Sequence, residues 1–328
     1  MKTLVLGTGT FGCALANHLS EKGVSVAIWG RDDEATRTLM QTRVLPSSLN
    51  GKTLHEDVAV STDLASAIAD RAVLVLAVPS VAVREVAQRI RPFYKNQILV
   101  VVAKGLEEES HMTMDEILRE TLETDRIAVL SGPTHAEEVA ANLPSSCVIG
   151  AANHDIAVLL QDLFMSETFR VYTSEDVKGI ELGGALKNII ALAAGMSDGL
   201  GYGDNAKAAL ITRGIVEITR LGVALGARPE TFGGLTGIGD LIVTCASRHS
   251  RNRKAGYLLG CGKSLDEALA EVGMVVEGVN ALHAAYDKAR ALGVDTPIIN
   301  AVYDVLYNGL PVTEVAKVLI SREKKRED

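Results

Sequence analysis

Lys187 is the residue whose surroundings point most directly to chemistry. It stands in the middle of residues 179–196, an almost wholly apolar stretch of helical length, and Asn188 follows it. The pattern predicts a helix buried on most of its faces. A buried ammonium must be paired, line a cavity or lose its charge, because an unpaired buried charge is strongly unfavourable. The alternative is that the aliphatic stem of Lys187 carries the ammonium to the surface.

Two later segments carry polar groups that could serve such a lysine. Asp240 follows the glycine-rich residues 233–239 and precedes apolar residues, as a partner for a buried cation would; it could instead cap a helix. Residues 248–254 are a polar, mostly basic cluster, which is either a solvated face or an anion site built from a guanidinium, a hydroxyl and an amide. Because the chain carries a net charge of -8, a small phosphate fits this cluster better than nucleic acid.

The start of the chain predicts the element that would hold a cofactor. The short apolar strand 3–6 leads into Gly7, Gly9 and Gly12 in a GxGxxG pattern, and residues 13–19 continue as a helix. Strand, glycine loop and helix in this order indicate a dinucleotide site. Gly7 would allow the tight turn, Gly9 the approach of backbone to the pyrophosphate, and Gly12 the packing of helix on strand. The pyrophosphate would lie at the helix N-terminus, where N–H groups and the dipole favour anions.

Arg31 bears on the choice between NADPH and NADH. It comes just after the second predicted strand, residues 24–29, at the place where an acidic side chain would bind the adenosine ribose. A guanidinium there could instead pair with a 2′-phosphate. Asp32 and Asp33 come directly afterwards and keep both cofactors open. We expect NADPH to be favoured and NADH to be usable.

The remaining apolar runs define the fold class. Residues 72–78, 98–103 and 127–130 predict strands buried on both faces of a parallel sheet, with further strands at 147–150 and 169–172. Ligands in such folds bind beyond the carboxyl ends of the strands, where Lys104 and residues 132–134 fall. Residues 34–57 are expected to be irregular, with a turn or two of helix.

The second half of the chain is predicted to be helical. A helix-start signal at residues 173–176 precedes the apolar stretch of Lys187. We therefore predict an α/β fold, with a Rossmann-type dinucleotide-binding domain over residues 1–176 followed by an all-helical C-terminal domain over residues 177–328. The later helices are expected at 205–225, 229–234, 251–260, 264–272, 278–292, 296–307 and 312–320.

Composition excludes several classes of protein. The 41 acidic and 33 basic residues leave no global basic footprint for nucleic acid or an anionic membrane. The four cysteines form no CxxC pair and have no histidine at metal-ligand spacing, so we expect buried thiols, a reducing compartment and no metal. The chain starts directly with a strand, and three polar residues interrupt the apolar stretch 179–196. These features predict neither a signal peptide nor a membrane span, and indicate a cytoplasmic protein.

Taken together, these motifs resemble the soluble bacterial-type NAD(P)-dependent glycerol-3-phosphate dehydrogenases along nearly the whole chain. The segments that carry the resemblance are residues 7–12, 103–107, 131–134, 182–188, 239–241, 250–253 and 275–278. The resemblance implies reversible reduction of dihydroxyacetone phosphate to sn-glycerol 3-phosphate with NADPH or NADH, which supplies glycerol phosphate for phospholipid synthesis. It also implies a homodimer.

The resemblance further implies roles for individual residues. Lys187 would be the catalytic proton donor and acceptor, close to Asp240 and Lys104. The residues that would line the substrate site are Lys104, Gly132, Thr134, Lys187, Asp240, Ser250, Arg251 and Asn252. The residues that would contact the cofactor are Gly7, Gly9, Thr10, Phe11, Gly12, Arg31, Lys104, Ala136, Arg251, Val275 and Glu277. Two alternatives stay open: a nucleotide-sensing protein without turnover, and a related reductase for another keto or hydroxy acid.

Overall fold

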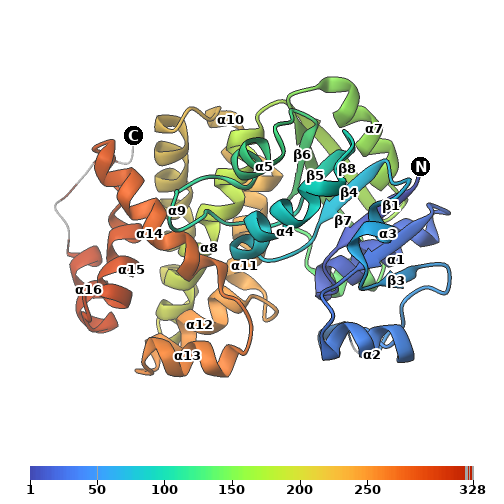
Figure 1. Ribbon diagram of the computed structural model, residues 1–328. Helices are drawn as coiled ribbons and strands as arrows, with labels where there is room; N and C mark the ends of the chain where they lie inside the picture. Colours follow the sequence, from blue (N-terminus) through green and yellow to red (C-terminus); the bar gives the residue numbers. More distant parts are fainter. Residues whose placement is uncertain (50, 322–323, 325, 327–328) are drawn as a thin grey trace. The chain divides into compact units, whose positions relative to one another are not determined.

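A computed structural model describes residues 1–49, 51–321, 324 and 326, and the chain forms two compact units (Figure 1). Unit 1 comprises Met1–Lys104 and Met112–Glu181, and unit 2 comprises Gly105–His111 and Leu182–Asp328. The boundary expected between residues 176 and 177 falls at the start of helix α8 (Val177–Gly199). The compact units instead divide within this helix, after Glu181.

Unit 1 is built on one eight-stranded sheet with the strand order β3-β2-β1-β4-β5-β6-β7-β8. The strands are β1 (Thr3–Leu6), β2 (Val26–Trp29), β3 (Ala59–Ser61), β4 (Val73–Leu76), β5 (Ile98–Val101), β6 (Ile127–Ser131), β7 (Ser145–Ala151) and β8 (Phe169–Ser174). Neighbouring strands are parallel except β6 and β7, which are antiparallel. The Rossmann-type sheet is therefore confirmed, and it includes both further strands that the sequence predicts.

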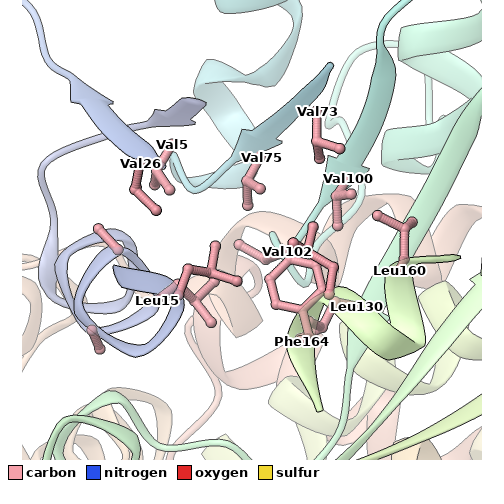
Figure 2. Packing of buried hydrophobic residues seen from close by; sticks show 14 of the residues in the cluster. Val5, Leu15, Val26, Val73, Val75, Val100, Val102, Leu130, Leu160 and Phe164 are labelled. Atoms are coloured by element: carbon pink, nitrogen blue, oxygen red, sulfur yellow. The ribbon is translucent and has the colours of Figure 1, made fainter. Parts of the chain in front are cut away.

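Side chains of the central strands alternate between two buried layers, which explains their continuous apolar sequence. Val5, Val75 and Val100 belong to the layer drawn in Figure 2, where they lie beside Leu15 and Phe164 of two helices. Their chain neighbours, the leucines of β1, β4 and β5, belong to the opposite layer. The sheet is thus covered by apolar side chains on both faces.

Seven α-helices accompany the strands of unit 1 among its described residues. They are α1 (Thr10–Glu21), α2 (Glu34–Thr42), α3 (Leu64–Ile68), α4 (Val83–Ile90), α5 (Met114–Leu122), α6 (Ala136–Ala140) and α7 (His154–Phe164). Helix α2 is the main helix within residues 34–57, the stretch expected to be irregular. Helices α1 and α7 contribute to the layer of Figure 2, and α3, α4 and α5 contribute to the opposite one.

Unit 2 is helical in its described part, as predicted. After α8 it contains α9 (Asp204–Ala224), α10 (Pro229–Phe232), α11 (Asp240–Ala246), α12 (Arg251–Gly260), α13 (Leu265–Val272), α14 (Glu277–Ala291), α15 (Pro297–Tyr307) and α16 (Val312–Ile320). The sequence-based prediction missed α11. It also missed the π-helical turn Leu235–Gly239 that leads into this helix.

Helix α8 is the core of unit 2. Leu186, Ile189 and Ile190 are fully buried, which confirms the expected burial on most faces. Helix α12 approaches α8 so closely that a Cβ at Gly256 would lie 2.0 Å from the carbonyl oxygen of Leu192. Any larger residue at position 256 would push α12 away from α8.

The described residues also show where the four cysteines lie and whether any helix could span a membrane. Burial raises the pKa of the Cys13, Cys147 and Cys245 thiols to about 12 each, so these are inert buried groups. Cys261 is exposed, which corrects the expectation that all four thiols are buried. No helix in the described part of the chain has the length and apolar character needed to cross a membrane.

The buried side chain of Glu217 on α9 binds the N-terminus of α15. It is 4% exposed, and its carboxylate accepts hydrogen bonds from the backbone N–H groups of Ile298 and Ile299. Burial raises the pKa of Glu217 from 4.5 to about 7, although the backbone N–H groups act in the opposite direction. The folded chain therefore holds this proton at pH values where the unfolded chain has released it.

We predict that Glu217 makes the folded state less stable as the pH rises from 4.5 to about 7. The loss should approach about 3 kcal/mol, because each pKa unit corresponds to about 1.4 kcal/mol. In Glu217→Gln this part of the pH dependence should disappear, as measured by urea unfolding across the interval. The exposed Glu56→Gln should keep it, and an unchanged slope in Glu217→Gln would contradict the prediction.

Candidate active site

The glycine loop of unit 1 has the geometry of a phosphate cradle. Gly7 has a φ of 121°, and a Cβ there would lie 2.5 Å from the carbonyl oxygen of Ala77. Gly9 is the N-cap of α1 and is exposed, and a Cβ there would meet open space beyond its chain neighbours. The first turn of α1 carries no acidic residue, so its free N–H groups are suited to an anion.

Other predicted cofactor residues in unit 1 lie at helix starts. Thr10 and Phe11 begin α1, and the Thr10 hydroxyl hydrogen-bonds that of Ser48 at 2.8 Å. Gly12 packs so tightly that a Cβ would lie 2.1 Å from the carbonyl oxygen of Gly7. Ala136 begins α6, which packs against α1. Thr10, Phe11, Gly12 and Ala136 thus belong to two adjoining helices of the same unit.

The two aspartates that follow Arg31 after β2 have partners within the same segment. Asp33 caps α2 by accepting the backbone N–H of Thr36, and this hydrogen bond lowers the pKa of Asp33. Asp32 accepts a hydrogen bond from Arg37 at 2.8 Å. The Arg31 side chain is 70% exposed and lies 4.0 Å from Asp33. Both carboxylates therefore have local partners, whereas the guanidinium is open to solvent.

Lys104, Gly132 and Thr134 meet beyond the carboxyl ends of β5 and β6. The Lys104 ammonium donates to the carbonyl oxygen of Gly132 at 2.7 Å. The Thr134 hydroxyl donates to the same oxygen at 3.2 Å and is largely buried. Strand ends of this kind are where ligands bind in open α/β sheets. The three residues expected to line a substrate site in unit 1 are thus brought together.

Lys187 is held by a buried ion pair in unit 2. Its ammonium lies 2.6 Å from Oδ1 of Asp240, with the two side chains 6% and 3% exposed. The Thr244 hydroxyl is 2.6 Å from the same ammonium and donates to the carbonyl oxygen of Asp240 at 2.6 Å. The surface alternative for Lys187 is therefore wrong. The carboxylate of Asp240 and the hydroxyl of Thr244 thus fix the ammonium in position.

Asp240 reaches Lys187 because of the turn that precedes it. The π-helical turn Leu235–Gly239 runs into α11, and Asp240 is the first residue of that helix rather than its cap. A Cβ at Gly237 would lie 2.0 Å from the carbonyl oxygen of Phe232, so the glycine run allows the turn to close. The predicted Lys187–Asp240 pairing is confirmed. Lys104 belongs to the other unit, and its proximity to Lys187 stays a prediction.

Thr244 is a functional candidate that the sequence analysis missed. It lies one helical turn after Asp240, is 3% exposed, and contacts both members of the ion pair. The spacing of four residues between Asp240 and Thr244 was a usable signal, because it places both on one helix face. That signal required α11 to be predicted first.

The predicted anion cluster lies at the start of α12. Ser250 caps the helix by accepting the backbone N–H of Arg253, and the first turn carries no acidic residue. Arg251 is exposed and donates to the carbonyl oxygen of Val275 at 3.0 Å. Glu277 begins α14 two residues after Val275. Three predicted cofactor residues of unit 2, Arg251, Val275 and Glu277, therefore gather in one region.

Asn252 connects three helices of unit 2. Its side-chain amide donates to Oδ1 of Asn188 on α8 at 2.8 Å, and its carbonyl oxygen accepts the backbone N–H of Gly278 at 2.8 Å. The side chain is nearly buried, and these contacts occupy its carbonyl oxygen and one N–H. Asn252 thus connects the start of α12 to α8 and α14. Its partner on α8, Asn188, is the residue next to Lys187.

Comparisons with known proteins also divide the chain into two parts, with the second part starting close to the start of α8. The family profile of the NAD-dependent glycerol-3-phosphate dehydrogenase N-terminus matches residues 2–157, and that of the C-terminus matches residues 176–317. Over 330 aligned residues the chain is 50% identical to a glycerol-3-phosphate dehydrogenase (NAD(P)+) of Fusobacterium nucleatum, covering 100% of this chain and 98% of the relative. A relative of the same description from Thermoanaerobacter is 48% identical, with 100% and 99% covered.

A solved structure shows the same similarity. The crystal structure of glycerol-3-phosphate dehydrogenase from Coxiella burnetii is 34% identical and has a TM-score of 0.93. The superposition covers 98% of this chain and 99% of that one. The likeness therefore extends over both units in sequence and in fold.

We predict that Asp240→Leu lowers the free energy of unfolding by about 3–5 kcal/mol, because it leaves the Lys187 charge buried without its carboxylate. The double variant Lys187→Met/Asp240→Leu should recover most of the loss, since it buries no charge. Urea unfolding at neutral pH measures both. Equal stability of the single and double variants would contradict the prediction, because the Lys187 charge would then be tolerated without the Asp240 carboxylate.

Proposed function

We propose an assignment of catalytic roles on the premise that the chain belongs to the NAD-dependent glycerol-3-phosphate dehydrogenase family. The protein is an NAD(P)-dependent oxidoreductase that reversibly reduces dihydroxyacetone phosphate to glycerol 3-phosphate. The buried Lys187–Asp240 pair is the observation that carries the assignment of roles, because it fixes a proton-bearing group inside an apolar unit.

The glycine loop fits a dinucleotide. The open Gly9, the tight turn at Gly7 and the acid-free start of α1 provide the space and polarity that a pyrophosphate needs. When bound, the reduced nicotinamide supplies the hydride that adds to the C2 carbonyl carbon. We assign Gly7, Gly9, Thr10, Phe11, Gly12 and Ala136 to cofactor binding from unit 1. Arg251, Val275 and Glu277 are assigned to it from unit 2.

Lys187 supplies the proton of the reduction. As the carbonyl oxygen gains negative charge, the Lys187 ammonium donates a proton to it and completes the C2 hydroxyl. Asp240 and Thr244 hold Nζ in one position throughout. In the reverse direction the neutral amine accepts the hydroxyl proton, and the same two residues keep it aligned.

The phosphate of the substrate is assigned to the start of α12. Arg251 offers a guanidinium there, and the helix N-terminus, capped by Ser250, carries no acidic side chain in its first turn. Asn252 holds this helix start against α8 and α14, and retains one side-chain N–H. Lys104, Gly132 and Thr134 contribute the substrate groups of unit 1.

Two other functions compete with this proposal. A nucleotide-sensing protein would have no use for the buried proton donor, which this chain keeps and pairs with Asp240. A reductase for an unphosphorylated keto acid would not need the basic start of α12. The family also supports our proposal of a cytoplasmic homodimer that supplies glycerol 3-phosphate for phospholipid synthesis.

We propose that the cofactor preference favours NADPH over NADH. Asp33 caps α2 and Asp32 accepts a hydrogen bond from Arg37, so both carboxylates are engaged by groups of the protein. Arg31 is exposed beside them and offers a guanidinium to that phosphate.

Lys187→Met is expected to lower kcat for dihydroxyacetone phosphate by at least about a hundredfold, because general acid catalysis is lost. NADPH binding, measured by fluorescence titration, should survive. The assay follows the loss of reduced-nicotinamide absorbance, and unphosphorylated dihydroxyacetone should react far more slowly in the unaltered protein.

Lys178→Met is the matched control on the same helix. Its ammonium pairs with Glu116 at 2.7 Å, and its side chain is 41% exposed. Near-normal turnover in Lys187→Met would refute the catalytic role, and equal rates with the unphosphorylated ketone would refute the phosphate site.

Arg31→Ala should reduce the ratio of kcat/KM for NADPH to kcat/KM for NADH by at least about tenfold, since a charge-assisted contact to the 2′-phosphate is removed. The ratio is measured with saturating dihydroxyacetone phosphate. Arg170→Ala, on exposed strand surface of β8, is the control. An unchanged ratio in Arg31→Ala would overturn the assignment of this residue.

A further inference from the structure

Three potential metal ligands meet in unit 2, in a cluster that the catalytic assignment does not use. His111 comes from the segment Gly105–His111, and His283 and Asp287 come from α14. One ligand atom from each residue lies within 4.8 Å of the other two. Their side chains are 28%, 39% and 42% exposed, so the cluster is accessible from solvent.

The separations suit a small tetrahedral ion. Nε2 of His111 is 3.7 Å and Nδ1 of His283 is 3.2 Å from Oδ2 of Asp287. Ligand atoms about 2.0–2.1 Å from a tetrahedral Zn²⁺ are roughly 3.3–3.4 Å apart. The two pairs that involve Asp287 fall on either side of that value, and one nitrogen of each imidazole lies within 4.8 Å of the other, so the side chains would move together to complete the geometry.

Helix α14 holds two of the ligands rigidly. His283 and Asp287 are four residues apart and therefore lie on the same face. The residues between and beside them are anchored, since Leu282, Ala284 and Ala285 are fully buried. The His283 ring also packs near Tyr303 and Tyr307 of α15, with ring centroids 5.8 and 5.9 Å apart. The helix and its neighbour thus fix the orientation of the imidazole.

The third ligand is presented by a strained turn. His111 has a φ of 59°, a conformation that side-chain-bearing residues rarely adopt. Its backbone N–H donates to the carbonyl oxygen of Glu107 at 2.9 Å, which closes the turn. The turn directs Nε2 towards Asp287, and the imidazole rings of His111 and His283 are 6.4 Å apart between centroids.

We propose that His111, His283 and Asp287 form a binding site for a divalent transition metal of the Zn²⁺ class. Ions of this class bind well to two imidazoles and one carboxylate. Mg²⁺ and Ca²⁺ instead take oxygen ligands. Water would complete the coordination. The bound ion joins the segment Gly105–His111 to α14 and so stabilises unit 2. The site departs from the sequence-based expectation of no metal.

An ion-pair cluster is the competing interpretation of the same residues. In that case Asp287 would attract whichever imidazole is protonated, and no metal would bind. The two interpretations differ in one measurable respect. Only a metal site gives saturable Zn²⁺ binding that depends on these side chains.

The test uses the full chain in a Cys261→Ser background, because the exposed thiol could bind metal separately. After EDTA treatment and dialysis, titration calorimetry with ZnCl₂ at pH above neutrality should show one Zn²⁺ per chain, and Zn²⁺ should raise Tm. His283→Asn and Asp287→Asn should each weaken Zn²⁺ binding by at least about tenfold and abolish the rise in Tm. Co²⁺ should give the visible absorption of a tetrahedral site.

His154→Asn, which removes an exposed histidine of α7, is the matched control and should bind Zn²⁺ as the background protein does. Absence of saturable binding in the background protein would overturn the proposal. So would binding that His283→Asn and Asp287→Asn leave unchanged, because the metal would then lie elsewhere.

Discussion

The buried ion pair between Lys187 and Asp240 is the interaction on which the helical unit depends. An ammonium at 6% exposure is tolerated only with a carboxylate and further hydrogen bonds around it. That requirement explains the short α11, the π-helical turn before it and the hydroxyl of Thr244. Replacing both charges by apolar groups would satisfy packing equally well, so stability alone does not account for the pair. The proton transfer that we propose for Lys187 is what such a pair would be needed for.

Features set by neighbouring residues were predicted well. The glycine loop, the buried strands and most helices are encoded in short patterns of glycine and apolar residues, and the structure reproduces them. Helix α11 was missed because the glycines at 233–239 suggest a loop, while the close contact that Gly237 makes with Phe232 is visible only in three dimensions. Thr244 could not be identified without that helix.

Charged residues show a second limit of prediction from sequence, because their availability to a ligand depends on local hydrogen bonds. Arg31, Asp32 and Asp33 are adjacent, and their order does not show which of them is available to a cofactor. The start of α2 decides this, because it engages Asp33 as its cap and places Arg37 against Asp32. Asn252 is similar, since its amide serves α8 and α14 as well as the proposed phosphate site. Local hydrogen bonding thus determines which polar groups can reach a ligand.

The proposed metal site lies beyond any local pattern, because His111 is far in sequence from His283 and Asp287. Its position also limits what it could do to catalysis. The segment that ends at His111 starts directly after Lys104, but Lys104 is independently anchored by the carbonyl oxygen of Gly132. A metal that fixes His111 to α14 would therefore restrain the segment without displacing Lys104. Metal occupancy should then change the thermal stability of the protein more than its KM for the substrate.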